Sequence, residues 1–459
     1  MMNYTLFALV VITLVPGITS IPLGSNSNSN DNDDNQLIIN LNDDYFKDYN
    51  TNDEETLKYI ESSIPNFKKQ QNLPPIQSLP IIKSERFLKK GEIPKYILDY
   101  APLVHLYTEE EYLPYDIEDY VKHFHLEFRN KTILTNQTLS LKKLGEYAND
   151  PNLNTNDLFL TSDFEFNDNP DWLTGKQNKP NLSSGLIKNA PSVLIVVDKG
   201  NGWVDAYWFY FYSFNLGPFV MGGGPYGNHI GDWEHSLMRF YNGLPIFVWM
   251  SAHGGGGGYH YKALEKSDID SKKPIIFSSR GTHANYASVG QHSHDLPFGM
   301  LSDFTDRGPL WDPSKNYLGY TWDGEILSPV SNESKPDNFK ELNYGDWLLF
   351  KGHWGDDKLS PEDPRQRWSP FEWKFIEGPT GPLTKHLNRI KLCQRAKWWN
   401  FWKGCPPKNF IKLGEGIEKE DGIVCANLFG WIRPFFLRNL LENLTWGGGL
   451  CNLMNLIWG

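Results

Sequence analysis

The hydrophobic pattern of this chain is that of strands over much of its second half. Long apolar and aromatic runs occupy residues 192–198, 203–214, 244–252 and 273–281, and each run is bounded by glycine or proline. Such runs are typical of β-strands. Several are apolar at consecutive positions, so both faces of the strand are expected to be buried between layers. The pattern predicts a mainly β fold whose core is an antiparallel β-sandwich with peripheral helices.

One helix is predicted before these strands. In residues 114–128 five apolar side chains recur at helical spacing after a proline: Ile117, Tyr120, Val121, Phe124 and Phe128. The two histidines in this stretch are expected to be surface groups.

The polar pattern divides the rest of the chain. Residues 1–20 contain a short apolar run that ends at a proline and a glycine, which predicts a cleaved secretory signal peptide. Residues 21–92 are rich in Asn and Asp and then in Pro, and we expect a disordered segment followed by an extended linker. The folded domain is expected over residues 93–383 and a C-terminal extension over residues 384–459.

Two further features agree with a secretory route. All four cysteines lie in the extension, which predicts two disulfides there, with three pairings open; they are Cys393, Cys405, Cys425 and Cys451. Five N-x-[ST] sequons predict a glycoprotein, and their asparagines are Asn130, Asn136, Asn181, Asn332 and Asn443. The expected location is the secretory pathway, the vacuole lumen or the extracellular space.

The distribution of charge argues against nucleic acid as a partner and is compatible with a membrane surface at one end of the chain. The net charge of −11 argues against nucleic acid, because phosphate neutralisation requires a basic surface. The extension differs from the rest, since residues 378–414 hold eight Lys or Arg, no Asp or Glu, and the run KWWNFWKG. This extension is expected either to pack on the acidic domain or to make a peripheral membrane contact.

The candidate chemistry lies in the stretch GNHIGDWEHSLMRF, residues 227–240. If it is a strand, Asp232 and Glu234 share one face, about 7 Å apart, and Trp233 points the other way. His229 lies in the glycine-rich turn just before them. Two close carboxylates require a proton or a cation between them. Mixed oxygen and nitrogen ligands predict a Mg²⁺, Ca²⁺ or Mn²⁺ site at His229, Asp232 and Glu234.

Two later histidines extend this site. His253 follows one predicted strand and precedes five glycines, and His283 follows another, with Arg280 nearby. Loops at strand ends commonly carry binding sites, so these three residues are candidates for an additional ligand site. A nucleophilic enzyme is disfavoured because no G-x-S-x-G elbow occurs, and the glycine runs lack the G-K-[ST] of a phosphate loop.

The chain resembles the fungal vacuolar protein sorting-associated protein 62 family and its plant relatives. The resemblance rests on YAPLVHLYTEEEYLPYDIEDYV, NHIGDWEH, SAHGGGGGYHY, SRGTHANYA, FTDRGPLWDP, YGDWLLFKGHWGD and EGPTGP, in order over residues 93–382. It implies a secretory or vacuolar protein involved in targeting to the vacuole.

A remoter similarity links NHIGDWEH, SAHGG and GTH to the necrosis- and ethylene-inducing peptide-like cytolysins. It implies a β-sandwich and a divalent cation held at His229, Asp232 and Glu234, in contact with sphingolipid head groups. Two elements of that family's pattern are missing: Gly231 replaces the second histidine of the heptapeptide, and residues 217–227 offer no upstream acidic ligand.

These observations give one leading hypothesis and two alternatives. The leading one is a non-catalytic vacuolar or secretory glycoprotein that binds a glycan or a lipid head group at a cation-dependent loop site. The alternatives are a metal-dependent hydrolase, in which the cation activates water, and a cytolysin-like membrane-active protein.

Overall fold

The computed structural model describes residues 76–79, 81, 86–135, 137–164, 170–219, 224–293, 301–330, 345–368, 372–392, 407, 408, 411 and 440. The chain divides into two units, residues 1–36 and 37–459, and all described residues belong to the second.

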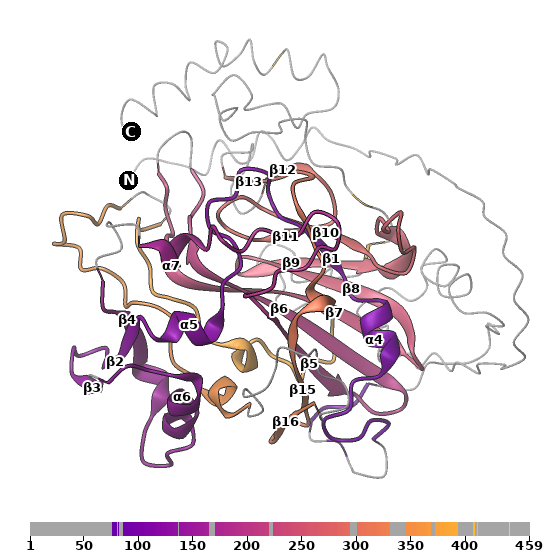
Figure 1. Cartoon of the computed structure of the whole chain (residues 1–459), viewed down its shortest axis with the longest axis horizontal. Helices are drawn as coiled ribbons and strands as arrows, with labels where there is room; N and C mark the ends of the chain where they lie inside the picture. The colour runs from indigo at the N-terminus through magenta and orange to yellow at the C-terminus, as the bar shows by residue number, and fades with distance from the viewer. Residues whose placement is uncertain are drawn as a thin grey trace, which may run out of the picture. The chain divides into compact units, whose positions relative to one another are not determined.

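A mixed seven-stranded sheet forms the centre of the fold (Figure 1). Its strands, in spatial order, are β16 (Leu327–Pro329), β15 (Tyr317–Trp322), β5 (Ser192–Asp198), β6 (Trp203–Asn215), β7 (His229–Tyr241), β8 (Leu244–Ala252) and β9 (Gly255–His260). The apolar runs of the sequence therefore become β5, β6 and β8 almost to the residue. Neighbouring strands are antiparallel except β5 and β15, which run parallel.

A second, four-stranded sheet lies against one face of the first. It contains β11 (Asn285–Tyr286), β10 (Ile275–Ser278), β1 (Leu103–His105) and β14 (Leu310–Trp311), and β1 pairs parallel with β10. Val104, Ile276 and Trp311 of this sheet belong to one buried cluster with Trp208 and Met238 of the seven-stranded sheet. Burial of that shared apolar face is the main force that joins the two sheets.

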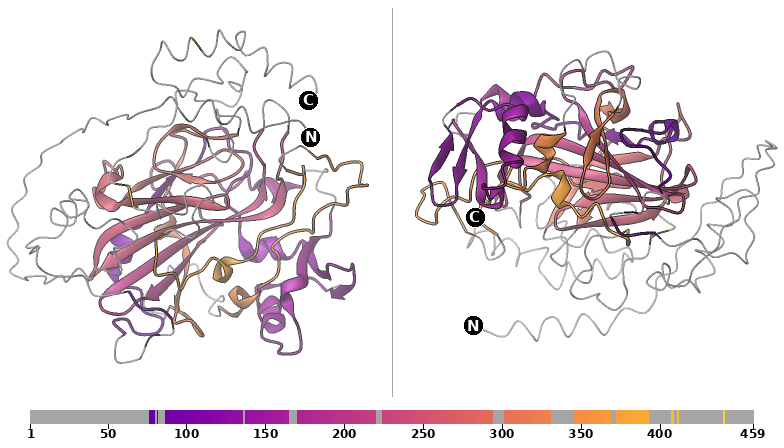
Figure 2. Two further views of the ribbon diagram at one scale, coloured as in Figure 1. Left: turned by 180° about the vertical axis from the view of Figure 1, so that it is seen from behind. Right: turned by 90° about the horizontal axis from the view of Figure 1, so that it is seen from below.

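The opposite face of the central sheet is covered by a mixed layer. It contains α5 (Ile117–Val121), β2 (Phe124–Phe128), β3 (Ile133–Thr135), α6 (Leu141–Ala148), β4 (Leu158–Ser162) and η9 (Asp346–Leu349). These elements share a second buried cluster with the central sheet, and Figure 2 shows α5, α6 and the β2–β4 sheet grouped together beside it. Within this cluster Trp233 stacks on Trp347, and Trp354 meets both rings edge to face.

The helix predicted over residues 114–128 is only partly correct. Asp116 caps α5 by accepting from the backbone N–H of Glu118, but the helix ends at Val121. The residues that follow form β2, which pairs with β4, and His125 of that strand binds Asp163. Phe124, Leu126 and Phe128 alternate with polar residues, which is the period of a strand, while Phe124 also fits the helical spacing. The pairing with β4 decides the conformation in favour of the strand.

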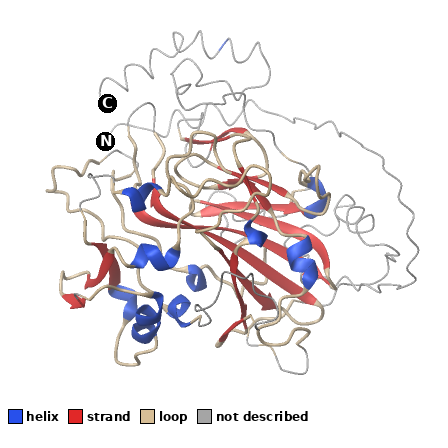
Figure 3. Cartoon of the chain, in the orientation of Figure 1, coloured by secondary structure: helices blue, strands red, loops and turns tan. Residues whose placement is uncertain are grey.

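The remaining elements are short, and the two strands among them pair as a separate two-stranded sheet (Figure 3). They are α4 (Lys95–Asp99), η3 (Thr155–Asp157), α7 (Asp171–Thr174), η5 (Tyr261–Ala263), β12 (Gly290–Ser293), β13 (Ser302–Thr305), η7 (Pro313–Lys315) and η10 (Pro382–Thr384). No helix in the described part of the chain is long and apolar enough to cross a membrane.

The prediction of a mainly β fold is confirmed. Several other predictions concern residues that the structure does not describe. The signal peptide, all four cysteines, Asn136, Asn332 and Asn443 lie outside the described residues. Asn130 and Asn181 are exposed. Part of the predicted linker packs on the domain: Ile76 and Ile81 are buried, and the backbone N–H of Gln77 donates to the Lys199 carbonyl (2.9 Å). The apolar residues spaced among its prolines account for this docking.

Candidate functional site

The start of β7 places the two predicted carboxylates on one face of the sheet. Asp232 pairs with Tyr212 and Glu234 with Tyr210, and both tyrosines belong to the buried cluster between the two sheets. Trp233 belongs to the cluster on the opposite face. Both carboxylates are nearly enclosed, at 5% and 8% exposed.

Asp232 is paired with a buried imidazole. The Nδ1 of His283 lies 2.9 Å from Oδ2 of Asp232, and its Nε2 lies 3.0 Å from the carbonyl oxygen of Tyr112. Both partners can only accept, so both ring nitrogens must donate and His283 is an imidazolium. Burial alone would lower its pKa, but the hydrogen bonds to Asp232 and Glu110 raise the pKa of His283 to about 9.

The ring of Tyr212 completes this enclosure. It stacks on the His283 imidazolium with centroids 3.7 Å apart and planes 3° from parallel. A cation over an aromatic face is stabilised further when desolvated. Two close carboxylates require a proton or a cation between them. At Asp232 the imidazolium of His283 is that cation.

Glu234 has a different partner. It accepts a short hydrogen bond from the hydroxyl of Ser251, at the end of β8. Burial, followed by repulsion from Asp232, raises the pKa of Glu234 to about 8. A carboxyl group with this pKa carries a proton at neutral pH, which also relieves the repulsion between the two acids.

His229 lies at the first position of β7 and is half-buried. Its Nδ1 is 2.7 Å from the carbonyl oxygen of Gly231, which accepts, so Nδ1 carries the proton and Nε2 is the acceptor. Burial lowers the pKa of His229, and the ring is therefore neutral at pH 7.

A second pair of acid and histidine lies nearer the surface. His253, 27% exposed at its side chain, places Nε2 2.7 Å from Oδ2 of Asp303, which is buried. Thr282 and Tyr286 donate to the same carboxylate. The buried acid therefore fixes the direction of a partly exposed imidazole, an arrangement that suits ligand binding.

Arg280 lies beside this pair, over a small hollow. The hollow is lined by Arg280, Thr282 and Asp303, together with residues 216–218. The guanidinium lies 3.8 Å from Glu111, and its side chain is 24% exposed. Of the predicted residues, Arg280 lines this hollow, and His253 is partly exposed next to Asp303, which lines it as well.

Each of the three predicted metal ligands has a hydrogen-bond partner inside the protein. Asp232 is taken by His283, Glu234 by Ser251 and Nδ1 of His229 by Gly231. Within the described part of the chain, no three or more His, Cys, Asp or Glu side chains are arranged to hold a metal. The metal site stays a prediction, and no step is derived through an ion.

The sequence reasoning missed Glu110, Ser251, Tyr286 and Asp303. Glu110 stands in the acidic run TEEEY and Asp303 in SDFTD, and neither local pattern distinguishes them from surface acids. Only the fold brings them to His283 and His253.

Gly231, the missing histidine of the heptapeptide, has a structural reason to be glycine. Its φ is +68°, and a Cβ there would lie 1.8 Å from the carbonyl oxygen of Trp354. The close approach of the segment around Trp354 excludes any side chain at this position.

The fold and the site together define a mainly β protein with buried acid–histidine pairs at the strand ends. The sequence profile of the family described as vacuolar protein sorting-associated protein 62 matches residues 67–355. The chain belongs to this family.

Two relatives from Saccharomyces cerevisiae are similar over most of their length. Vacuolar protein sorting-associated protein 62 is 50% identical over 414 residues, which cover 84% of this chain and 87% of the relative. The putative vacuolar protein sorting-associated protein TDA6 is 48% identical over 422 residues, 84% of this chain and 88% of the relative.

The matched solved structures are far more distant. One is Necrosis and Ethylene inducing Protein 2 from the causal agent of cocoa's Witches Broom disease, with 11% identity, coverage of 53% of this chain and 81% of that chain, and a TM-score of 0.23. Another is NLPPya in complex with mannosamine, with 12% identity, 53% and 82% coverage and a TM-score of 0.23. These scores are too low to support an argument about this chain.

Proposed function

We propose that the chain acts in vacuolar protein sorting as a non-catalytic binding protein of the secretory or vacuolar route. Its ligand, a glycan or a lipid head group, would meet the polar rim formed by His253, Asp303 and Arg280. Family membership supports the sorting role, because the two relatives named for that process share about half of its residues.

The observation that carries the binding role is the His253–Asp303 pair. An imidazole that a buried carboxylate holds in place, next to a guanidinium over a hollow, presents oriented polar groups to a ligand. Asp232 and Glu234, by contrast, are satisfied inside the protein. This division of roles favours recognition over acid–base chemistry at β7.

A cell assay tests the proposal. The chromosomal gene is replaced by the His253→Gln, Arg280→Gln double variant, and the fraction of a vacuolar hydrolase secreted to the medium is measured. We expect secretion to rise toward that of the deletion, while the exposed-site control Lys142→Gln sorts normally. Normal sorting by a double variant present at normal abundance would refute the role of the rim.

The divalent cation, Mg²⁺, Ca²⁺ or Mn²⁺, is tested separately by elemental analysis of the purified full chain. If His229, Asp232 and Glu234 bind an ion, the wild type carries near-stoichiometric metal that Asp232→Asn loses. Equally low metal in both leaves the His283 imidazolium as the positive partner of Asp232. A contact of the extension, residues 384–459, with membranes belongs to the same proposal and is measured by deleting those residues in a vesicle-sedimentation assay.

A further inference from the structure

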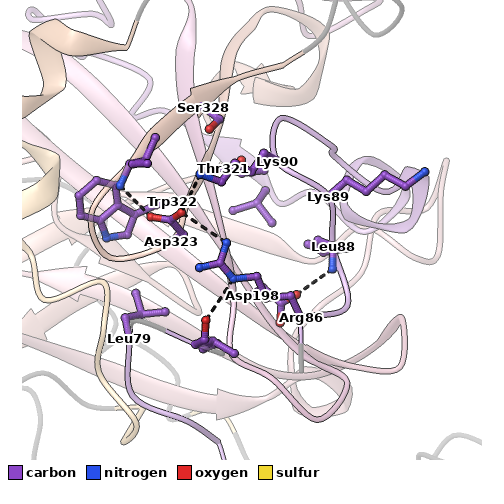
Figure 4. A pocket seen from close by; sticks show the side chains of 13 residues that line it. Leu79, Arg86, Leu88, Lys89, Lys90, Asp198, Thr321, Trp322, Asp323 and Ser328 are labelled. Atoms are coloured by element: carbon purple, nitrogen blue, oxygen red, sulfur yellow. Dashed lines mark hydrogen bonds and ion pairs between the residues drawn. The ribbon is translucent and has the colours of Figure 1, made fainter. Parts of the chain in front are cut away.

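A second cavity lies at the other end of the central sheet. It lies between residues 86–90 and the ends of β5 and β15 (Figure 4). Asp198 there pairs with Val204 at the start of β6, whereas His229 pairs with Asn215 at its end. Eleven residues of strand, roughly 35 Å, separate the two sites.

Both carboxylates that line this cavity already have partners within the protein. Asp198 accepts from the backbone N–H groups of Phe87, Leu88 and Gly200. Asp323 accepts from the backbone of residues 325 and 326 and pairs with Arg86 (3.4 Å) and Lys90 (3.2 Å). Their role is to fix residues 86–90 on the sheet edge.

The cations are in excess. Arg86, Lys89 and Lys90 face two carboxylates, so the lining carries a net charge of +1 on a chain whose net charge is −11. Arg86 donates through Nε to Ile81 and through Nη1 to Asp323, and its Nη2 has no hydrogen-bond partner among the residues described. Figure 4 shows this guanidinium in the middle of the cavity, below Asp323.

Most of the other lining residues are apolar. Leu79, Leu88, Val196 and Trp322 are among the lining residues. Ile326, one of these lining residues, is 51% exposed, and Phe87, which stands between the lining residues Arg86 and Leu88 in the sequence, is 58% exposed. Exposed apolar groups beside Lys and Arg are typical of surfaces that meet anionic amphiphiles.

We propose that this cavity binds an amphipathic anion, a single phosphate or carboxylate group attached to an apolar body. The anion would pair with Nη2 of Arg86, with Lys89 close by. The apolar body would contact Leu88 and Trp322 in the cavity and the exposed side chains of Phe87 and Ile326. The source of such a molecule is either a bilayer lipid or a free amphiphile. This site is independent of the rim at His253 and Arg280.

The test uses the purified full chain with two kinds of probe. Calorimetry measures binding of short-chain, soluble phosphatidic acid and of inorganic phosphate, and sedimentation measures binding to phosphatidylcholine vesicles with and without phosphatidic acid. We expect the soluble amphiphile to bind more tightly than inorganic phosphate. Binding to the mixed vesicles as well supports a bilayer source, and binding of the soluble amphiphile alone supports a free one.

Variants locate the binding. Arg86→Gln should weaken it about fivefold, the equivalent of about 1 kcal/mol for one cation next to an anionic group, and Arg86→Lys should retain most of it. If Arg86→Gln does not fold, the double variant Lys89→Gln, Phe87→Asp carries the test, because both side chains are exposed. Its matched control, Lys142→Gln with Ile269→Asp, changes an exposed lysine and an exposed isoleucine elsewhere.

Three outcomes would overturn the proposal. They are no binding of the soluble amphiphile, binding of inorganic phosphate as tight as that of the amphiphile, and an unchanged affinity in the folded variants.

Discussion

At the scale of single residues, the acid–histidine pairs of the site show which features a sequence reveals. Strand alternation alone placed Asp232 and Glu234 on one face, because the period of a strand is two. The partners were not predictable in the same way. His283 lies 51 positions after Asp232 and 173 positions after Glu110 in the sequence. Only the fold therefore brings its imidazolium into contact with these carboxylates.

The imidazolium gives a pH-dependent prediction. The pKa of His283 in the folded protein, about 9, is above its ordinary value of 6.5. Its stabilisation is therefore complete below about pH 6.5 and is lost as the pH rises through about 9. His283→Gln, which leaves Asp232 without a cation, should lower the free energy of unfolding by about 3–5 kcal/mol at pH 6.

Denaturant unfolding at several pH values measures this effect. The difference between wild type and His283→Gln should shrink by about 3 kcal/mol between pH 6 and pH 10. His386→Gln is the control, because His386 also has a positive φ (55°) but is exposed. A difference that does not change with pH would show that His283 is neutral.

A second prediction concerns Gly231. Gly231→Ala combines left-handed backbone strain with a clash against the Trp354 carbonyl, and should destabilise the protein by about 2–5 kcal/mol. Gly243→Ala separates the two effects, since its φ is also positive (+81°) but the new Cβ would meet Tyr96 at an ordinary 3.4 Å. It should cost only about 1–2 kcal/mol. Thermal unfolding of the two variants compares them, and equal losses would exclude the clash.

At the scale of elements, the sequence was most informative for strands that are apolar on both faces. β5, β6 and β8 follow from their composition, because long β-branched and aromatic runs have few other stable conformations. β2 did not follow, because a short amphipathic stretch fits either period and its pairing with β4 is a tertiary effect. The parallel pairing of β5 with β15 was equally hidden, since 118 residues separate Asp198, the end of β5, from Tyr317, the start of β15.

The attachment of residues 387–390 to the central sheet is also a tertiary effect. Arg239 and Asp205 form an ion pair of 2.7 Å with both side chains fully buried. Arg239 also donates to the Ile390 carbonyl (2.6 Å), and Lys199 donates to that of Leu387 (3.1 Å). The guanidinium of Arg389 lies over Trp249 at 4.4 Å. These contacts fix the beginning of the C-terminal extension on the central sheet.

Arg239→Met should destabilise the protein by about 3–5 kcal/mol, because Asp205 would remain buried without its cation. The double variant Asp205→Leu, Arg239→Met should regain much of that loss, yet still release residues 387–390. Limited trypsin digestion at Lys385, Arg389 and Lys391 measures the release. The surface control Lys143→Met, which breaks an exposed pair with Glu146, should leave stability almost unchanged. Unchanged digestion in the double variant would show that Arg239 does not anchor the segment.

At the scale of the whole molecule, the fold separates two polar regions by the length of β6. One end carries the acid–histidine pairs and the rim at His253 and Arg280, and the other carries the cavity at Arg86. The candidate residues of the first region were visible in the sequence as histidines beside glycines at strand ends. The second region was not, because its basic residues lie in a stretch whose composition predicted a linker.

The central claim is that the rim around His253, Asp303 and Arg280 binds a polar ligand, and direct binding tests it most closely. The purified full chain and its Asp303→Asn variant are applied to a glycan array and to liposomes that display different head groups, each with and without chelator. We expect at least one probe to bind the wild type and to bind Asp303→Asn about tenfold more weakly, the effect of releasing an oriented imidazole. No binding to any probe, or equal binding by both proteins, would contradict the account.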